Sequence, residues 1–428
     1  MKNLFFAVAF IASFQSFGFR PVGHVVLQRT ISKNLPKDNL FKRAMEAYPV
    51  YAAWGAVGPD LAYVPVPGSK RNMAKSLNYA DMAHYYKTGS FCRALIEEAV
   101  ASKDEKLIAF AAGWLTHVAG DFGSHRNFVY PEAGFYLENE AGRDRHGELE
   151  KFAESIIFIE RGRLLDEAYY TDERLKADIL FNDFFKTKVT PGAKMQREDQ
   201  VLRPFLNKVF QSVYKEPYHL ELSFVMKNYD LAFGRSGGKM FGFEILNYKD
   251  AQKGLSLSPS LRLNLDSAFN YAANYGKKLL EDCLVNKSLF SDAWNLDVGP
   301  DSKTMVIKVQ LDSQPASGST NPLFINLKLG TTISSKLNYH MKVIKDIRYN
   351  RNDVLYSYVS LNPCSFAPDK KYSFFIGKVG PIKDDTRIKS ISIEQNGIPV
   401  YFSDKKLELV KNAKNSSDEF YFSDFLNH

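Results

Sequence analysis

Imidazole and carboxylate side chains recur at helical spacing in one short segment, Gly113–His125, which reads GWLTHVAGDFGSH. If this segment is a helix, His117, Asp121 and His125 stand four residues apart and project from nearly one face. Such a face would be unfavourable in a core helix without partners, because a buried carboxylate needs a cation or hydrogen bonds. Imidazole nitrogens and carboxylate oxygens together are ligands that suit zinc. The spacing therefore indicates a metal site.

Further candidate ligands lie on both sides of this segment. Downstream, His146 and Glu150 are one helical turn apart, whereas the competing Glu148 is only two residues from His146 and points to another face. Upstream stand His24, Asp60 and His84. Asp60 ends a Gly-Pro-Asp sequence, which is typical of a rigid, exposed bend that presents a carboxylate.

None of these features is specific by itself. A lone histidine is more often structural than a ligand, and an isolated His–Glu pair is often a solvated helix face. The series as a whole is more informative, since five of the eight histidines fall between residues 24 and 146. Their co-occurrence with the carboxylates favours a site that holds several metal ions.

The composition is that of a globular protein of two domains. The chain has 428 residues, of which 45% are hydrophobic and 14% aromatic, and these values exclude a disordered or fibrous protein. The net charge of +8 suits attraction to anionic lipid or to nucleic acid, but it does not choose between them. A merely basic soluble protein fits it equally well.

The first 18 residues resemble a secretory signal peptide. Lys2 precedes an apolar run from Leu4 to Ala12, and the small residues Ser16 and Gly18 permit cleavage before Phe19. The run is too short to span a bilayer, and no later stretch reaches about 18 apolar residues. We therefore expect a soluble mature protein that is secreted or periplasmic and begins at Phe19.

The three cysteines, Cys92, Cys283 and Cys364, lie far apart and show no metal-ligand spacing. They permit at most one disulfide, and we interpret them as incidental to the site.

The hydrophobic period changes along the chain. Three- and four-residue spacing predicts helices over most of residues 24–290, for example at 94–100, 107–125, 148–159 and 263–284, although 186–260 is hard to assign. Short strands are predicted at 304–311, 323–329, 372–376, 388–393 and 399–402, at intervals typical of a β-sandwich. Residues 412–428 are predicted to be a polar tail.

The complete series resembles the bacterial zinc-dependent phospholipase C family of the clostridial alpha-toxin type, which is related to the single-strand-specific zinc nucleases. The order His24, Asp60, His84, His117-x-x-x-Asp121-x-x-x-His125 and His146-x-x-x-Glu150 carries this resemblance, and Glu154 continues it. It covers roughly residues 19–285. The short spacing from Asp121 to His125 departs from the best-known secreted members and is closer to the branch that cleaves glycosylphosphatidylinositol.

The resemblance implies three zinc ions. Asp60, His84, His117 and Asp121 would hold the first ion, and His125, His146 and Glu150 would hold a second, more exchangeable one. His24 and Asp121 would hold the third, together with the free amine and carbonyl of Phe19, which stands where the family usually has tryptophan. Chelation uses main-chain atoms, so Phe19 is acceptable there once the signal peptide has been removed.

The resemblance also implies the domain architecture. A signal peptide at 1–18 would precede a helical catalytic domain of the phospholipase C and zinc nuclease type at 19–290. A lipid-binding β-sandwich of the lipoxygenase-homology or C2-like type would occupy 300–411. The loop at 312–320 lies where such domains often bind calcium, but it lacks convincing acidic residues, so calcium is unassigned.

The function implied is a zinc phospholipase C that releases diacylglycerol and a phosphorylated head group. Asp121 would bridge two zinc ions, and Asp60 could also orient or deprotonate the attacking water. A single-strand nuclease is the alternative, and the predicted lipid-binding sandwich favours phospholipid over nucleic acid as the partner. A catalytically inactive surface-binding protein is disfavoured because every ligand position is filled. We expect a monomer and predict no protein partner.

Overall fold

The computed structural model describes residues 19–61, 79–80, 82–133, 140–162, 195–215, 248–256 and 259–296, and then 304–314, 323–329, 353–360, 372–378, 386–395, 398–404, 407–409 and 419–422. The chain forms two compact units. The first consists of Met1–Ala133 and Arg143–Gly299, and the second of Gly134–Gly142 and Pro300–His428.

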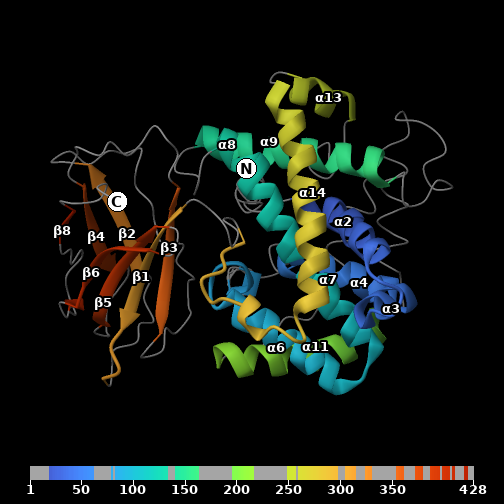
Figure 1. The fold of residues 1–428 in the computed structure, drawn as a ribbon, viewed down its shortest axis with the longest axis horizontal. Helices are drawn as coiled ribbons and strands as arrows, with labels where there is room; N and C mark the ends of the chain where they lie inside the picture. Colours follow the sequence, from blue (N-terminus) through green and yellow to red (C-terminus); the bar gives the residue numbers. More distant parts are fainter. Residues whose placement is uncertain are drawn as a thin grey trace, which may run out of the picture. The chain divides into compact units, whose positions relative to one another are not determined.

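The described part of the first unit is helical (Figure 1). Its α-helices are α2 (Arg20–Asn34), α3 (Leu40–Ala47), α4 (Pro49–Leu61), α6 (Thr88–Ser102), α7 (Glu105–Ser124), α8 (Tyr130–Ala133), α9 (Glu140–Ile156), α11 (Met195–Tyr214), α13 (Tyr248–Ser256) and α14 (Pro259–Asp282). Two π-helical turns, η1 (His125–Val129) and η2 (Ile157–Arg161), continue α7 and α9, and a 3₁₀ turn, η7 (Lys287–Leu289), follows α14. The prediction of a helical N-terminal region is confirmed.

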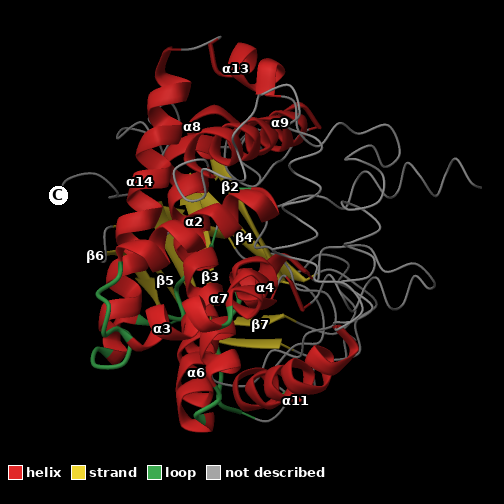
Figure 2. Cartoon of the chain, turned by 90° about the vertical axis from the view of Figure 1, so that its right-hand side faces the viewer, coloured by secondary structure: helices red, strands yellow, loops and turns green. Residues whose placement is uncertain are grey.

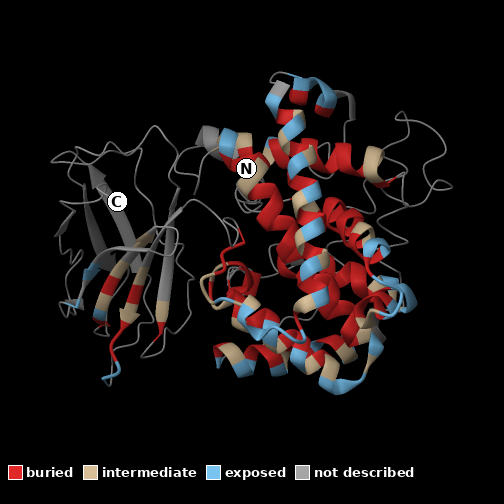
Figure 3. Cartoon of the chain, viewed as in Figure 1, coloured by how far each residue is buried: buried red, intermediate tan, exposed pale blue. Residues whose placement is uncertain are grey.

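Helix α7 is the centre of this unit. Every residue from Leu107 to Ser124 is buried, which Figure 3 shows as a continuous red helix. It packs along α4 and α14 and also contacts α2, α3 and α6. Gly113 allows the approach of α4, because a Cβ atom there would lie 2.1 Å from the carbonyl oxygen of Ala52. The helix begins at Asp104, whose side chain accepts a hydrogen bond from Lys106 N.

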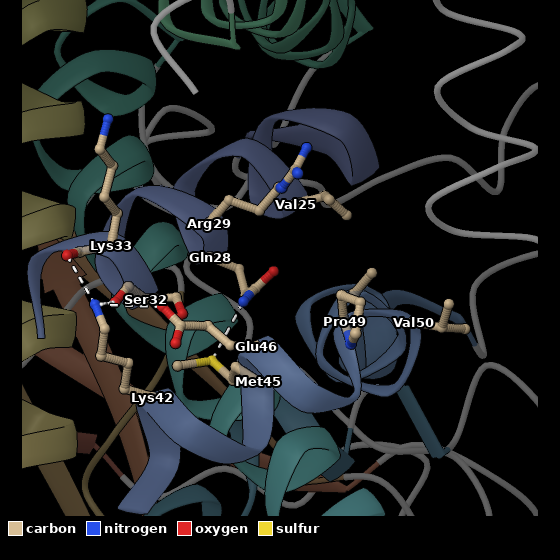
Figure 4. Close-up of a pocket in the computed structure, with 11 residues that line it drawn as sticks. Val25, Gln28, Arg29, Ser32, Lys33, Lys42, Met45, Glu46, Pro49 and Val50 are labelled. Carbon is tan, nitrogen blue, oxygen red and sulfur yellow. Dashed lines mark hydrogen bonds and ion pairs between the residues drawn. The ribbon is translucent and has the colours of Figure 1, made fainter. Parts of the chain in front are cut away.

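Helix α2 borders a groove shared with α3 and α4 (Figure 4). The volume of the groove is about 440 Å³, and Val25, Met45 and Val50 contribute apolar lining. Lys42 Nζ donates to the carbonyl oxygens of Ser32 and Lys33 at the C-terminal end of α2. These contacts fix the far end of the helix that carries His24.

The described secondary structure after residue 303 consists of strands, drawn in yellow in Figure 2. One sheet has the order β3-β1-β5-β6, and β7 also pairs with β5. The other sheet has the order β2-β4-β8. The strands are β1 (Thr304–Leu311), β2 (Leu323–Leu329), β3 (Val354–Ser360), β4 (Tyr372–Lys378), β5 (Thr386–Gln395), β6 (Ile398–Ser403), β7 (Leu407–Leu409) and β8 (Glu419–Phe422). The pairings between them are antiparallel.

Three strands differ from the sequence prediction, and one of them is the short β7, which was not predicted. β3 was not predicted, although its sequence VLYSYVS is rich in residues that favour strands. β8 lies within residues 412–428, where a polar tail was expected, and its sequence EFYF carries three aromatic residues, which also favour strands. The packing of the two sheets as a sandwich, its lipoxygenase-homology or C2-like type and the domain boundaries stay predictions.

Three further sequence predictions concern the signal peptide, membrane-spanning helices and the cysteines. Residues 1–18 lie outside the described residues, so the signal peptide stays a prediction. In the described part of the chain, no helix has both the length and the apolarity needed to cross a bilayer. Cys92 and Cys283 are buried free thiols, and Cys364 lies outside the described residues.

Candidate metal centre

Eight side chains predicted as ligands converge inside the helical unit from separate elements. α2 contributes His24, α4 contributes Asp60, the helical turn before α6 contributes His84, α7 contributes His117 and Asp121, η1 contributes His125, and α9 contributes His146 and Glu150. All are buried, with at most 3% of each residue exposed. They form three groups, each of which could hold a metal ion.

The first group contains Asp60, His84 and His117. Asp60 Oδ1 lies 3.2 Å from His84 Nε2 and 3.7 Å from His117 Nε2. Asp121 Oδ2 also faces this group, at 3.6 Å from His84 Nε2 and 3.2 Å from His117 Nε2. Two ligands of a tetrahedral zinc ion, each at about 2.1 Å from it, are separated by about 3.4 Å. The four distances fit such an arrangement.

Backbone carbonyls orient two of these rings. His84 Nδ1 lies 2.8 Å from the carbonyl oxygen of Ala80, and His117 Nδ1 lies 2.8 Å from that of Ala56. A carbonyl oxygen can only accept, so each contact places the proton on Nδ1 and leaves the Nε2 lone pair of the neutral ring for a metal ion. Both rings are therefore oriented by backbone atoms that do not belong to the group of candidate ligands.

The second group contains His24, His117 and Asp121. Asp121 Oδ1 lies 3.3 Å from His24 Nε2, and the rings of His24 and His117 stack with centroids 3.9 Å apart. Gly120 on α7 leaves room for the ring of His24, since a Cβ atom at Gly120 would lie 2.7 Å from His24 Nδ1. The backbone nitrogen of Phe19 lies 3.5 Å from His24 Nε2. The N-terminal position predicted as a ligand thus lies at this group.

The third group contains His125, His146 and Glu150. Glu150 Oε1 lies 3.6 Å from His125 Nε2 and 2.6 Å from His146 Nε2. The shorter distance is that of a direct hydrogen bond rather than of two ligands around one ion. His125 Nδ1 lies 3.4 Å from the carbonyl oxygen of Leu296, which follows α14. Glu148 is exposed and forms an ion pair with Arg145, so it takes no part in this group.

The family model described as zinc dependent phospholipase C matches residues 23–198 of the chain. Residues 23–198 belong to the zinc-dependent phospholipase C family. The resemblance inferred from the histidine and carboxylate series is thereby confirmed. The eight converging side chains, from His24 to Glu150, all lie inside this zinc-dependent phospholipase C segment, and Phe19 lies just before it.

Two solved structures are similar to the chain at low identity. The alpha-toxin of Clostridium perfringens from an avian strain is 12% identical, with 96% of this chain and 100% of the toxin covered and a TM-score of 0.25. The alpha toxin of Clostridium absonum is 13% identical, with the same coverage and a TM-score of 0.28. These TM-scores are too low to establish a common fold. The comparison with curated proteins found no match.

Asp60 differs from its predicted setting. The Gly-Pro-Asp sequence was expected to form an exposed bend, but Pro59 and Asp60 lie in the last turn of α4, and Asp60 is fully buried. Packing of α4 along α7 holds this turn helical, and such tertiary packing commonly overrides a local turn preference. The helical backbone directs the carboxylate toward His84 and His117 rather than toward solvent.

Burial and neighbouring charges set the protonation states of the candidate ligands in the phospholipase C segment. Burial, helped by His117, lowers the pKa of His24 to about 4, so its ring is neutral at pH 7. Burial opposes ionisation of Asp121, but the positive charges that His117 and His24 can carry hold its pKa well below the usual range. In the same way burial opposes ionisation of Glu150, and His146 lowers its pKa. Neutral imidazoles and ionised carboxylates are the forms that bind metal ions.

The nitrogen and oxygen atoms that the structure brings together are suited to binding zinc. Among the described residues, both carboxylate oxygens of Asp121 and Nε2 of His117 are buried without a hydrogen bond of regular geometry. Buried polar atoms of this kind are costly unless an ion or another partner satisfies them. Nitrogen and oxygen donors at these distances match the preferences of zinc.

Sequence reasoning assigned no role to several residues that hold the site. The carbonyls of Ala56, Ala80 and Leu296 carried no signal, because any residue can supply a carbonyl. Glu154 did carry a signal in the sequence, since it continues the four-residue spacing of His146 and Glu150. It is buried and accepts a hydrogen bond from Val22 N at 2.9 Å.

Proposed function

We propose that the helical unit is a zinc-dependent phospholipase C that hydrolyses phospholipids to diacylglycerol and a phosphorylated head group. The observation that carries the proposal is the position of Asp121. Its Oδ1 faces His24 while its Oδ2 faces His84 and His117, so one carboxylate is shared between two groups that could hold metal ions. The family match over residues 23–198 supports phospholipid as the substrate class.

The proposed ligand sets follow the three groups. Asp60, His84, His117 and Asp121 would hold one zinc ion, and His125, His146 and Glu150 a second. His24 and Asp121 would hold the third, together with the amine and carbonyl of Phe19 after cleavage of the expected signal peptide. Secretion would then precede full assembly of the site. Calcium is not part of the proposal.

The chain's own residues would prepare the reaction in three ways. Asp121 faces two groups of candidate ligands with its two carboxylate oxygens. The carbonyls of Ala56 and Ala80 fix the rings of His117 and His84. Asp60, whose Oδ1 faces both of these histidines, is placed to orient water and to accept its proton. Zinc bound here would supply positive charge that offsets charge developing on the phosphoryl oxygens and would lower the pKa of bound water.

Parallel assays test the proposal. The secreted protein, loaded with zinc, is incubated with phospholipid vesicles and separately with single-stranded DNA, and the products are identified. Release of diacylglycerol and a phosphorylated head group, abolished by a chelator, supports the proposal. Cleavage of DNA without cleavage of lipid would establish the nuclease alternative, and binding to vesicles with cleavage of neither substrate would establish an inactive binding protein.

A further inference from the structure

The chain makes an unusual turn at the first residue of α2. Arg20 has φ of 53°, in the left-handed region that residues other than glycine rarely adopt. This turn folds Phe19 back along the helix, so that its backbone nitrogen lies 3.5 Å from His24 Nε2. Strained backbone persists only where the surrounding structure fixes it. The contacts of residues 19–22 must therefore fix this turn.

The side chain of Phe19 provides the first of these contacts. Phe19 is fully buried. Its ring centroid lies 5.9 Å from that of Phe269 on α14 and 6.1 Å from that of His24. Burial of this ring is favourable and opposes the cost of the left-handed residue.

Helix α9 provides the remaining contacts. Arg20 Nη2 donates to the carbonyl oxygen of Gly147 at 3.2 Å, and Arg20 Nε lies 4.0 Å from Glu150 Oε2. One turn beyond Glu150 on the same helix, Glu154 Oε1 accepts from Val22 N at 2.9 Å. The helix that carries His146 and Glu150 therefore also holds the segment that brings Phe19 to His24.

The first turn of α2 needs an acceptor from outside the helix. Phe19, at the N-cap, forms no side-chain capping bond, and Pro21 has no N–H to donate. Glu154 supplies the acceptor for Val22 from a position 132 residues away in the sequence. A carboxylate at this end of a helix also interacts favourably with the helix dipole.

We propose that Glu154 is a positioning residue that holds residues 19–22 in the turn placing the Phe19 nitrogen at the His24–Asp121 group. It binds no metal ion in this account and acts through the backbone of Val22. The inference rests on the proposed function for its chemical consequence, which is a complete third metal site. Its structural part concerns the geometry of the chain alone.

Hydrogen–deuterium exchange of the mature protein, which we expect to begin at Phe19, tests the structural part. In Glu154→Ala, peptides covering residues 19–26 should exchange about tenfold faster than in the wild type, because a buried donor loses its acceptor. Peptides from α7 should be unchanged. Glu154→Gln retains an acceptor oxygen and should restore most of the protection. Glu148→Ala, which removes an exposed carboxylate from the same helix, is the matched control and should behave as the wild type.

Zinc content provides the second readout. Glu154→Ala should bind about one equivalent less than the wild type, and Glu154→Gln should recover it. If Glu154→Ala does not fold, Glu154→Asp gives the same test, since its side chain is one methylene shorter, withdraws the acceptor from Val22 N and should loosen residues 19–26. Unchanged protection of residues 19–26, or equal loss of protection in α7, would overturn the inference. A wild-type protein that binds no zinc would instead overturn the proposed function, while the exchange result would still decide the role of Glu154.

Discussion

Asp121 Oδ1 lies 3.3 Å from His24 Nε2, whereas Oδ2 of the same carboxylate lies 3.2 Å from His117 Nε2. A single carboxylate thus serves two groups of candidate ligands. If both groups bind zinc as proposed, the charge of Asp121 acts on two metal ions.

Asp121→Asn should therefore cost more activity than Glu150→Gln. The amide keeps the shape of the side chain but removes the charge shared by two groups, whereas Glu150 belongs to a single group. The expected loss in kcat/KM for Asp121→Asn is on the order of a hundredfold or more, the scale of removing a principal electrostatic contribution. Turnover of phospholipid by both purified variants provides the measurement. An Asp121→Asn enzyme near wild-type turnover would contradict the shared role.

Much of this site follows from local spacing in the sequence. The four-residue intervals that join His117 to Asp121 and His146 to Glu150 predicted one helix face each, and α7 and α9 carry these pairs. The helical period is set by the backbone, so such neighbours can be predicted without tertiary structure.

Contacts between distant segments could not be predicted in this way. The pairing of Val22 with Glu154 and the approach of His125 to Leu296 depend on how the helices pack. The prediction that Asp60 lies in an exposed bend was wrong for the same reason. It rested on the local turn preference of Gly-Pro-Asp and took no account of the packing of α4 on α7.

An extension of the chain before Phe19 tests the role of the terminus. If one methionine precedes Phe19 in the mature protein, the free amine moves away from His24, and only His24 and Asp121 are left at the third site. Such a protein should fold, keep the other two metal ions and lose most of its activity. N-terminal sequencing, zinc analysis and phospholipid hydrolysis are measured on the same sample. A fully active extended protein with three zinc ions would show that the terminus is not a ligand.

The C-terminal strands provide a third test. If the region from about residue 300 onward docks on lipid, deleting it should weaken hydrolysis of vesicles. Hydrolysis of a short soluble phosphodiester should be spared, because the eight candidate side chains all precede this region. The ratio of the two rates is the measurement. Equal losses on both substrates would mean that the region only stabilises the fold.

The stability of the metal-free protein should depend on Glu154. Burial raises the pKa of Glu154 from 4.5 to about 7, against the opposing effects of Arg20 and of the Val22 N–H, and Glu150 raises it further. Between these two values the folded state binds more protons than the unfolded state, so stability falls as the pH rises from 4.5 to 7. The full effect is about 3 kcal/mol.

Chemical denaturation at pH 5 and pH 8 measures this dependence. Glu154→Gln cannot ionise, so its free energy of unfolding should fall less over this interval than that of the wild type. Comparing the two proteins cancels the contributions of other groups, among them His24, whose lowered pKa acts in the opposite direction. Identical pH dependence in both proteins would exclude this role of Glu154.

Metal analysis of the purified, secreted protein after reconstitution with zinc tests the central claim most directly. Each of the three buried groups of imidazoles and carboxylates could hold a metal ion, so about two to three zinc equivalents should remain bound after removal of free metal. A chelator should remove them and abolish hydrolysis. Fewer than about one equivalent after reconstitution would contradict the assignment of the site.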